Sequence, residues 1–453
     1  MGSNDIDSPV YDVLVIGGGP GGAVAAMELA RRKFRVLVLE KSPFPRFHIG
    51  ESLVPHTYAL LKELGLEQAV KKVPHMKKWG AEFAIGDCPA NETSRFTFDT
   101  GYIPGGMTLN VERAGFDAML LREAKAAGAE VRTRVGVKKI LRLADGDVAV
   151  KADDGETITA RYLLDASGQA TVVAKYLGTK QPLGDACFQK VAYFGHFEGV
   201  KRLGGAEEGH PAIFMAEEGW FWVINIDAKR TSIGFVADAA MTKALGVPAD
   251  RVLAWAIQRC PLLRERTQDA TAPQRNEVIA NFSYRCRPFA GEGYYLVGDA
   301  AAFIDPIFST GVYVATIGAL KAADALTEVL RERTTPAKAR RDYVRHMEGG
   351  TSVFFKLIRQ YYDHSFRELF LNGVGPHDIH RAVLAALAGH VFPKPVWALR
   401  WRLALFNAFV VINRFVPLVP RRAKFSLLKS SGEGRAAQAA PGLLLPTTAP
   451  RGA

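Results

Sequence analysis

Three glycines and one glutamate near the N-terminus have the types and spacing to bind a dinucleotide. Gly17, Gly19 and Gly22 complete the pattern GxGxxG directly after the apolar run YDVLVI and before a helix-forming run. Such glycines permit a tight turn and a close approach of the pyrophosphate to the backbone, and the helix N-terminus offers free N–H groups to the phosphates. Glu40 ends the second apolar run and is placed to accept a hydrogen bond from a ribose hydroxyl.

Segments far downstream resemble the parts that complete an FAD site in glutathione-reductase-type flavoproteins. Gly298 and Asp299 follow a strand-like run, and the resemblance implies that this pair holds the ribityl and pyrophosphate portion of FAD. The segment LLDASG at residues 163–168 resembles a strand-end turn of the same fold, and Arg113 matches an arginine near the flavin. No second glycine-rich unit for NAD(P)H is visible, so we expect reduced flavin (FADH2) to come from a separate flavin reductase.

One lysine, two tryptophans and the start of a helix-forming run are further candidates. Burial would lower the pKa of Lys78 and leave part of it neutral, but its basic neighbours also suit a solvated face. Trp220 and Trp222 are two apart in a strand-like run, so they point to one face, which also fits core packing. Thr310 and Gly311 begin the helix-forming run, where free N–H groups suit a small anion or a simple cap.

Four motifs that contain these residues resemble the flavin-dependent halogenases and their monooxygenase relatives. They are PRxHxGESL at 45–53, KxGxxF at 78–83, WxWxI at 220–224 and FxxPxxSxG at 303–311. The resemblance covers residues 10–335 well and the remaining chain only loosely.

The resemblance implies an enzyme that halogenates an aromatic ring. Reduced FAD and O2 would form a flavin C4a-hydroperoxide, which oxidises chloride or bromide near Thr310 and Gly311 to hypohalous acid. Lys78 would deliver the halogen through a hydrogen bond or as a chloramine, and Trp220 and Trp222 would keep the organic substrate from the flavin. The resemblance further implies that Ser309 is catalytic. It assigns cofactor binding to Gly17, Gly19, Gly22, Glu40, Arg46, Ser52, Arg113, Asp299 and Pro306.

The substrate class is indicated by Phe308, which stands where tryptophan halogenases place a glutamate. In this respect the segment resembles the phenol and pyrrole halogenases, whose substrates already donate electrons into the ring. We therefore expect an electron-rich phenol or pyrrole from secondary metabolism such as antibiotic biosynthesis, either free or tethered to an acidic carrier protein.

An α/β fold must position these residues. We expect a glutathione-reductase-type FAD-binding Rossmann domain over 10–335 with an inserted antiparallel substrate-side sheet at about 75–110 and 180–285. A mainly helical, basic unit should follow over 336–435, and a mobile tail over 436–453. Aromatic residues spaced by 7, 4 and 4 predict one helical face that packs in the core or lines the pocket. The aromatic residues of this series are Phe354, Phe355, Tyr361, Tyr362, Phe366 and Phe370.

Charge and cysteine usage narrow the functional class. The 453 residues carry a net charge of +12, and residues 331–435 hold 19 Lys and Arg against 7 Asp and Glu. This unit is either a solvated helical face or a docking surface for an acidic carrier or an anionic membrane, while no nucleic-acid motif accompanies it. Four cysteines lie far apart without metal-ligand spacing, so we expect no metal and a cytoplasmic location. No apolar run is long enough to span a membrane.

Three rival functions remain open. An aromatic hydroxylase on the same fold would use NAD(P)H directly and need an open route from substrate to flavin. A prenyl reductase of the geranylgeranyl type would use the basic C-terminal segment 397–422 at a membrane. Neither accounts for Lys78 and the paired tryptophans. The third rival is a flavin-binding protein without turnover.

Overall fold

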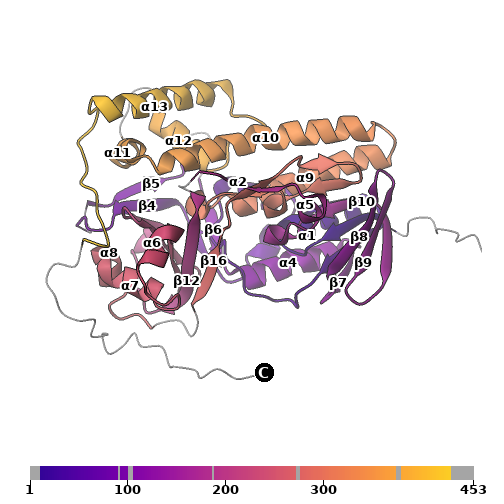
Figure 1. Ribbon diagram of the computed structural model, residues 1–453, viewed down its shortest axis with the longest axis horizontal. Coiled ribbons are helices and arrows are strands. Elements are labelled where there is room, and N and C mark those ends of the chain that lie inside the picture. The colour runs from indigo at the N-terminus through magenta and orange to yellow at the C-terminus, as the bar shows by residue number, and fades with distance from the viewer. Residues whose placement is uncertain are drawn as a thin grey trace, which may run out of the picture.

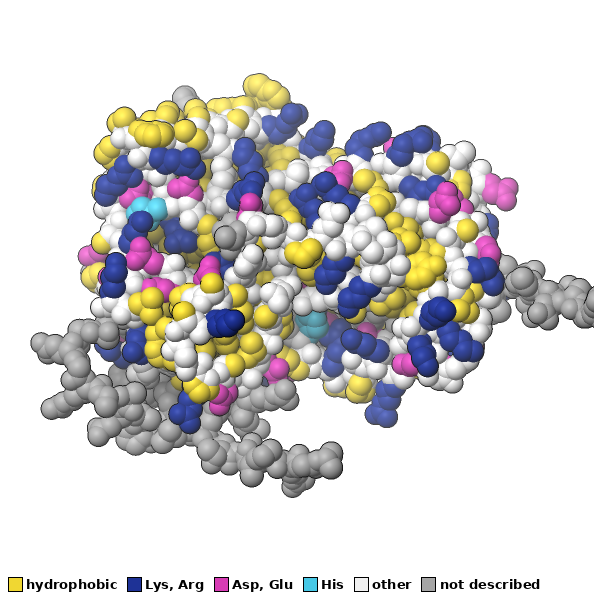
Figure 2. Space-filling view, in the orientation of Figure 1, with side chains coloured by type: hydrophobic (Ala, Val, Ile, Leu, Met, Phe, Trp, Pro, Cys, Tyr) yellow, Lys and Arg dark blue, Asp and Glu magenta, His cyan; other side chains and the backbone are white. Residues whose placement is uncertain are grey.

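The computed structural model describes residues 11–89, 92–99, 106–185, 188–271, 276–373 and 379–429, and the predicted tail over 436–453 lies outside them. Figure 1 shows one large sheet, which contains β1, at one end of the molecule and a second large sheet at the other. The helices that follow residue 335 run along one side of both regions. Figure 2, in the same orientation, shows lysine and arginine side chains spread over much of the visible surface.

The first sheet has a parallel core of short, buried, apolar strands, as expected for a sheet covered on both faces. Its order is β18-β19-β10-β1-β2-β7, and a hairpin of β8 and β9 pairs with β10. The strands are β1 (Tyr11–Ile16), β2 (Val36–Glu40), β7 (Glu130–Thr133), β8 (Val137–Ala144), β9 (Asp147–Ala152), β10 (Thr157–Asp165), β18 (Ala290–Gly291) and β19 (Tyr294–Leu296). Segments distant in sequence therefore meet at the carboxyl ends of β1, β10 and β19.

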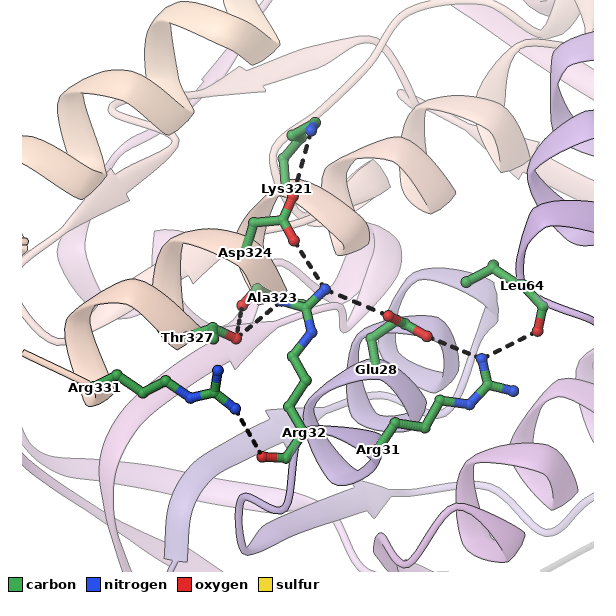
Figure 3. Close-up of polar contacts among 9 residues, drawn as sticks. All are labelled: Glu28, Arg31, Arg32, Leu64, Lys321, Ala323, Asp324, Thr327 and Arg331. Carbon is green, nitrogen blue, oxygen red and sulfur yellow. Dashed lines mark hydrogen bonds and ion pairs between the residues drawn. The ribbon is translucent and has the colours of Figure 1, made fainter. Parts of the chain in front are cut away.

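Long helices cover this sheet. They are α1 (Pro20–Arg31), α4 (Arg113–Ala126) and α9 (Gly311–Leu330), and α1 packs on both of the others. Arg32 links α1 to α9, because its guanidinium donates to Thr327 Oγ1 and Asp324 Oδ1, each at 2.9 Å (Figure 3). Glu28 accepts from Arg31 in the same network. This contact fixes the helix that ends at Arg31 against the helix that begins at Gly311.

The second sheet lies beside the first and has the order β16-β12-β15-β14-β13-β4-β5. Its strands are β4 (Gly80–Ile85), β5 (Ser94–Thr97), β12 (Lys190–Glu198), β13 (Ala212–Met215), β14 (Gly219–Asn225), β15 (Arg230–Asp238) and β16 (Glu277–Ala280). Its pairs are antiparallel except β4 with β13, which is parallel and departs from the expected antiparallel sheet. Phe221 packs on Phe235 on the opposite face from the two tryptophans, as alternation along a strand requires.

Smaller elements join the two sheets. Two short sheets are formed by β3 (His75–Lys78) with β6 (Thr108–Val111), and by β11 (Lys180–Pro182), β17 (Tyr284–Cys286) and β20 (Ala302–Phe303). The short helices are α2 (Pro55–Glu63), α3 (Glu67–Val70), α5 (Val172–Leu177), α6 (Ala239–Ala244), α7 (Val252–Arg259) and α8 (Pro261–Arg266). The predicted α/β arrangement, with an inserted sheet and a helical C-terminal part, is confirmed.

The C-terminal helices are α10 (Pro336–Tyr361), α11 (His364–Asn372), α12 (Ile379–Leu387) and α13 (Trp397–Phe415). The expected single aromatic helix face is wrong. Helix α10 ends at Tyr361, and the next helix, α11, begins at His364. Asp363 caps α11 by accepting a hydrogen bond from the N–H of Ser365 at 3.0 Å. Phe354 and Phe370 therefore lie on different helices, although both belong to one core cluster that also contains Trp220.

Candidate active site

A cavity of about 490 Å³ lies where the two sheets meet α9 and α10. Most of the predicted residues line it, although they come from segments as distant as β1 and the start of α9. Gly22 and Lys78 are not in the lining. The predicted residues that line it are Gly17, Gly19, Glu40, Arg46, Ser52, Arg113, Trp220, Trp222, Asp299, Pro306, Ser309, Thr310 and Gly311.

The glycine turn after β1 has no room for side chains where it packs and is open where a ligand would approach. Gly17 has φ +99°, and a Cβ on it would lie 2.4 Å from the carbonyl oxygen of Ala166. A Cβ on Gly22 would lie 1.9 Å from the Gly17 oxygen, so this glycine packs under the turn instead of lining the cavity. The Cα of Gly19 faces the cavity, with Arg46 as its nearest neighbour. The turn at the N-terminus of α1 therefore fits the pyrophosphate of FAD.

Glu40 is held at the end of β2 by two backbone donors. Its Oε2 accepts from the N–H of Gly18 and its Oε1 from the N–H of Ser42, both at 2.8 Å. A carboxylate oxygen has two lone pairs, so each can also accept from a ribose hydroxyl. The geometry fits the role expected for this residue.

Arg113 is buried and holds the segment 45–53 against the cavity. Its Nη1 donates to the carbonyl oxygen of Ile49 at 2.6 Å, and its Nε pairs with Asp117 at 2.8 Å. Asp299 also lines the cavity; burial raises its pKa to about 6, and the charge of the nearby Arg113 opposes that rise. A carboxyl so poised can accept or donate a hydrogen bond to a bound polyol chain.

Lys78 is 3% exposed at the end of β3, which excludes the solvated face that its basic neighbours suggested. Its Nζ donates to Ser52 Oγ and to the carbonyl oxygen of Leu53, both at 2.9 Å, and lies 4.9 Å from the Phe98 ring. Burial lowers the pKa of Lys78 to about 7, because the charged form loses its hydration. Ser52 lines the cavity, so the ammonium group lies directly behind the cavity wall.

The two tryptophans form one side of the cavity. Trp220 and Trp222 are 1% and 5% exposed, and their ring centroids are 6.0 Å apart. Trp222 Nε1 donates to Ser232 Oγ at 3.0 Å, and a Cβ on Gly234 would lie 2.2 Å from the Trp222 ring. Both indoles are therefore fixed by hydrogen bonds or by close packing.

The Ser-Thr-Gly run forms the start of α9 beside the cavity. Ser309 has φ +56° and turns the chain, Thr310 occupies the N-cap position without a side-chain hydrogen bond to the helix, and Gly311 is the first helical residue. The first N–H groups of a helix have no partner within the helix, and both Thr310 and Gly311 line the cavity. Phe308 packs edge-on against Tyr361 at 5.8 Å, so no carboxylate occupies that position.

Comparison with known proteins agrees with this arrangement. A family model described as FAD binding domain matches residues 10–341. The 1H-pyrrole-2-carbonyl-(peptidyl-carrier protein) brominase of Pseudoalteromonas luteoviolacea is 32% identical over 397 residues, 85% of this chain and 94% of the relative. The chain belongs to the flavin-dependent halogenases.

Solved structures of halogenases share the fold. The flavin-dependent brominase Bmp2 matches this halogenase with a TM-score of 0.77 and 29% identity, covering 89% of this chain and 99% of that one. The myxobacterial chondrochloren halogenase CndH matches with a TM-score of 0.72 and 30% identity, covering 91% and 98%. The expected family and class of enzyme are therefore confirmed.

The structure of this halogenase adds a buried acid and phenol that the sequence did not indicate. Tyr362 donates its hydroxyl proton to Asp305 Oδ2 at 2.5 Å and accepts from Trp220 Nε1 at 3.3 Å. Burial raises the pKa of Asp305 to about 6, and the hydrogen bond from Tyr362 opposes this. Asp305 lies inside the segment 303–311, so its place could have drawn notice, but its partner comes from the end of α10.

Two further polar groups near the site were also missed. His210 is buried near Lys78, and neither of its ring nitrogens has a hydrogen-bond partner among the described residues. Burial lowers the pKa of His210, and the charge of Lys78 adds to this effect. Glu51, which lines the cavity, pairs with His196 at 2.5 Å. A lone histidine gives no sequence signal of its own, whereas Glu51 belongs to the motif GESL.

In the described part of the chain no cluster of His, Cys, Asp or Glu could hold a metal ion. No described helix is long and apolar enough to cross a membrane.

Proposed function

We propose that this halogenase oxidises chloride or bromide at the start of α9 and transfers electrophilic halogen through Lys78 to an electron-rich phenol or pyrrole. When bound, reduced FAD supplies, with O2, the oxidising equivalents that turn halide into hypohalous acid. The observation that carries the proposal is the buried Lys78 ammonium, held by Ser52 and Leu53 directly behind the cavity wall.

The halide end of the reaction is assigned to the N-terminus of α9. The N–H groups of Thr310 and Gly311 and the positive end of the helix dipole stabilise a small anion there. Ser309 and Pro306 shape the turn that brings these donors to the cavity.

The lysine end receives the hypohalous acid. A lysine with a pKa near 7 is present in both protonation states at neutral pH. The charged form donates a hydrogen bond to the hypohalous acid. The neutral form attacks its halogen and breaks the oxygen–halogen bond; the released hydroxide takes the amine proton as water and leaves a chloramine, or a bromamine where the halide is bromide. Either form holds the halogen away from bulk water, since Lys78 is buried.

Trp220 and Trp222 act as the barrier between the cofactor part of the cavity and the organic substrate. Their fixed rings fill the wall through which an aromatic substrate would otherwise reach the flavin. The oxidant is then consumed by halide instead of by direct hydroxylation of the ring.

The substrate and the partners belong to the same proposal. The similar brominase acts, by its name, on a pyrrole-2-carbonyl group carried by a peptidyl carrier protein. A carrier-bound pyrrole or a free phenol fits the absence of a carboxylate at Phe308. A separate flavin reductase in the cytoplasm supplies the FADH2.

Replacement of Lys78 by methionine tests the proposal. With FADH2, O2 and bromide, the wild type should brominate phenolic or pyrrolyl-carrier substrates detected by mass spectrometry. Lys78→Met should reduce product at least about 10²-fold, the usual scale for loss of a positioned acid or base, while flavin oxidation continues. Lys77→Met is the matched control, because Lys77 is exposed on the same strand.

Two results would contradict the proposal. Bromination that survives in Lys78→Met would remove the lysine from the reaction. Hydroxylated product with NAD(P)H alone, without a reductase or halide, would identify an aromatic hydroxylase.

A further inference from the structure

Helix α13 has an outer face of large apolar side chains that no part of the described chain covers. Trp397 and Phe415 at its two ends are 75% and 80% exposed, and Val411 and Ile412 between them are about half exposed. These residues recur at helical spacing and continue past the helix to Val416 and Leu418, which are also exposed. Figure 2 shows hydrophobic side chains gathered along the edge of the molecule that α13 forms.

The opposite face of α13 is packed into the molecule. Leu399, Phe406 and Val410 are buried, and Asn413 Nδ2 donates to Glu368 on α11 at 2.9 Å. The helix also packs on α12. Because the inner face packs on α11 and α12, the outer face is held in a fixed orientation toward solvent.

The chain segment that carries the outer face is basic. Residues 379–429 contain nine Lys and Arg and no Asp or Glu. Two of its arginines form ion pairs with α11: Arg414 pairs with the capping residue Asp363, and Arg421 pairs with Glu368. No ion pair within the described residues involves the exposed Lys394, Arg400 or Lys424. An apolar helix face with uncompensated basic residues beside it matches the surface of an anionic bilayer.

The position of the helix favours lipid over a carrier protein. No residue of α11, α12 or α13 lines the cavity, so a carrier docked on the outer face would not present its tethered group at the site. The 19-residue helix is about 28 Å long. Its large exposed apolar residues stand at both ends, Trp397 at the start and those from Val411 to Phe415 at the end, with Ala404 and Ala408 exposed between them. This separation suits a flat partner better than a small globular domain.

We propose that the outer face of α13, from Trp397 to Leu418, binds the surface of an anionic lipid bilayer. The helix lies in the plane of the headgroups with its aromatic ends inserted, and Lys394, Arg400 and Lys424 contact lipid phosphates. The contact is peripheral and does not depend on the halogenation proposed above.

Sedimentation of the full chain with lipid vesicles tests this inference. The wild type should pellet with phosphatidylcholine vesicles containing phosphatidylglycerol and much less with phosphatidylcholine alone. The double variant Trp397→Asp and Phe415→Asp should need at least about tenfold more lipid for half-binding, because two inserted aromatic side chains are lost. At low salt, Lys394→Glu with Arg400→Glu should also weaken vesicle binding at least about tenfold. At high salt this variant should bind like the wild type, because salt screens the attraction between basic residues and lipid phosphates.

Matched controls separate the face from general effects. Tyr176→Asp replaces an exposed aromatic elsewhere, and Lys138→Glu with Lys139→Glu makes the same charge change on β8. Both controls should bind vesicles like the wild type. All variants should keep wild-type halogenation of a free phenol in detergent-free buffer, so failure here is distinct from failure of the proposed reaction.

Three results would overturn the inference. The first is no binding to anionic vesicles, and the second is binding that the α13 variants leave unchanged. The third is a concentration-dependent dimer, or a complex with an acidic carrier protein, that the Trp397→Asp and Phe415→Asp variant abolishes while vesicles have no effect on it.

Discussion

At the scale of single residues, Lys78 exchanges hydration for two protein acceptors. Its ammonium group is bonded to Ser52 and Leu53, and burial lowers its pKa to about 7. The unfolded chain keeps a lysine pKa near 10.4 and therefore binds more protons than the folded chain between these values. The cost of burying the charge is fully present below pH 7 and disappears as the pH rises towards 10.

This difference predicts a pH-dependent stability. The free energy of unfolding of the wild type should rise by about 2 kcal/mol between pH 7 and pH 9 relative to that of Lys78→Met. Urea denaturation at several pH values measures it. Lys77→Met should keep the pH dependence of the wild type, since Lys77 is exposed. If the free energy of unfolding changed with pH in the same way in the wild type and in Lys78→Met, the prediction would be wrong, because the pKa of Lys78 would then be the same in the folded and unfolded chains.

At the scale of elements, Tyr362 joins three segments that are far apart in sequence. From the end of α10 its hydroxyl bonds Asp305 before α9, and it also accepts from Trp220 on β14. The hydroxyl thus ties the tryptophan wall to the loop that carries the proposed halide donors. A loss of this bond should loosen both at once.

Tyr362→Phe should therefore increase the leakage of oxidant. We expect several-fold more free hypohalous acid per product formed, and a loss of stability of about 1–3 kcal/mol, because Asp305 and Trp220 lose a buried partner. Halogenation of monochlorodimedone, with catalase to remove peroxide, measures the leak. Tyr361→Phe is the control, since the buried Tyr361 hydroxyl has no hydrogen-bond partner in the described part of the chain. Equal leakage in the two variants would refute the coupling.

At the scale of the whole molecule, short sequence patterns predicted those turns, strands and helix starts that depend only on a few adjacent residues. The turn at Gly17, the strand before Asp299 and the helix start at Gly311 follow from backbone geometry and short spacing. Contacts between distant segments could not be predicted in this way. The position of Tyr362 depends on a helix break at Asp363, which sets a new register for the aromatic residues after it.

The same long-range packing predicts that the molecule unfolds as one unit. A single core cluster contains Trp220 of the second sheet, Phe308 before α9 and Phe366 of α11. Phe366 stacks on Phe370 and meets Phe406 edge-on, and it is fully buried.

Phe366→Ala should therefore lower the free energy of unfolding by about 3–5 kcal/mol. Tryptophan fluorescence and far-ultraviolet circular dichroism should report one coincident transition, shifted equally in the variant. Phe415→Ala, at an exposed position, should change stability by less than about 0.5 kcal/mol. Two separate transitions, with only one displaced by Phe366→Ala, would mean that the helices after residue 335 fold independently of the sheet they cover.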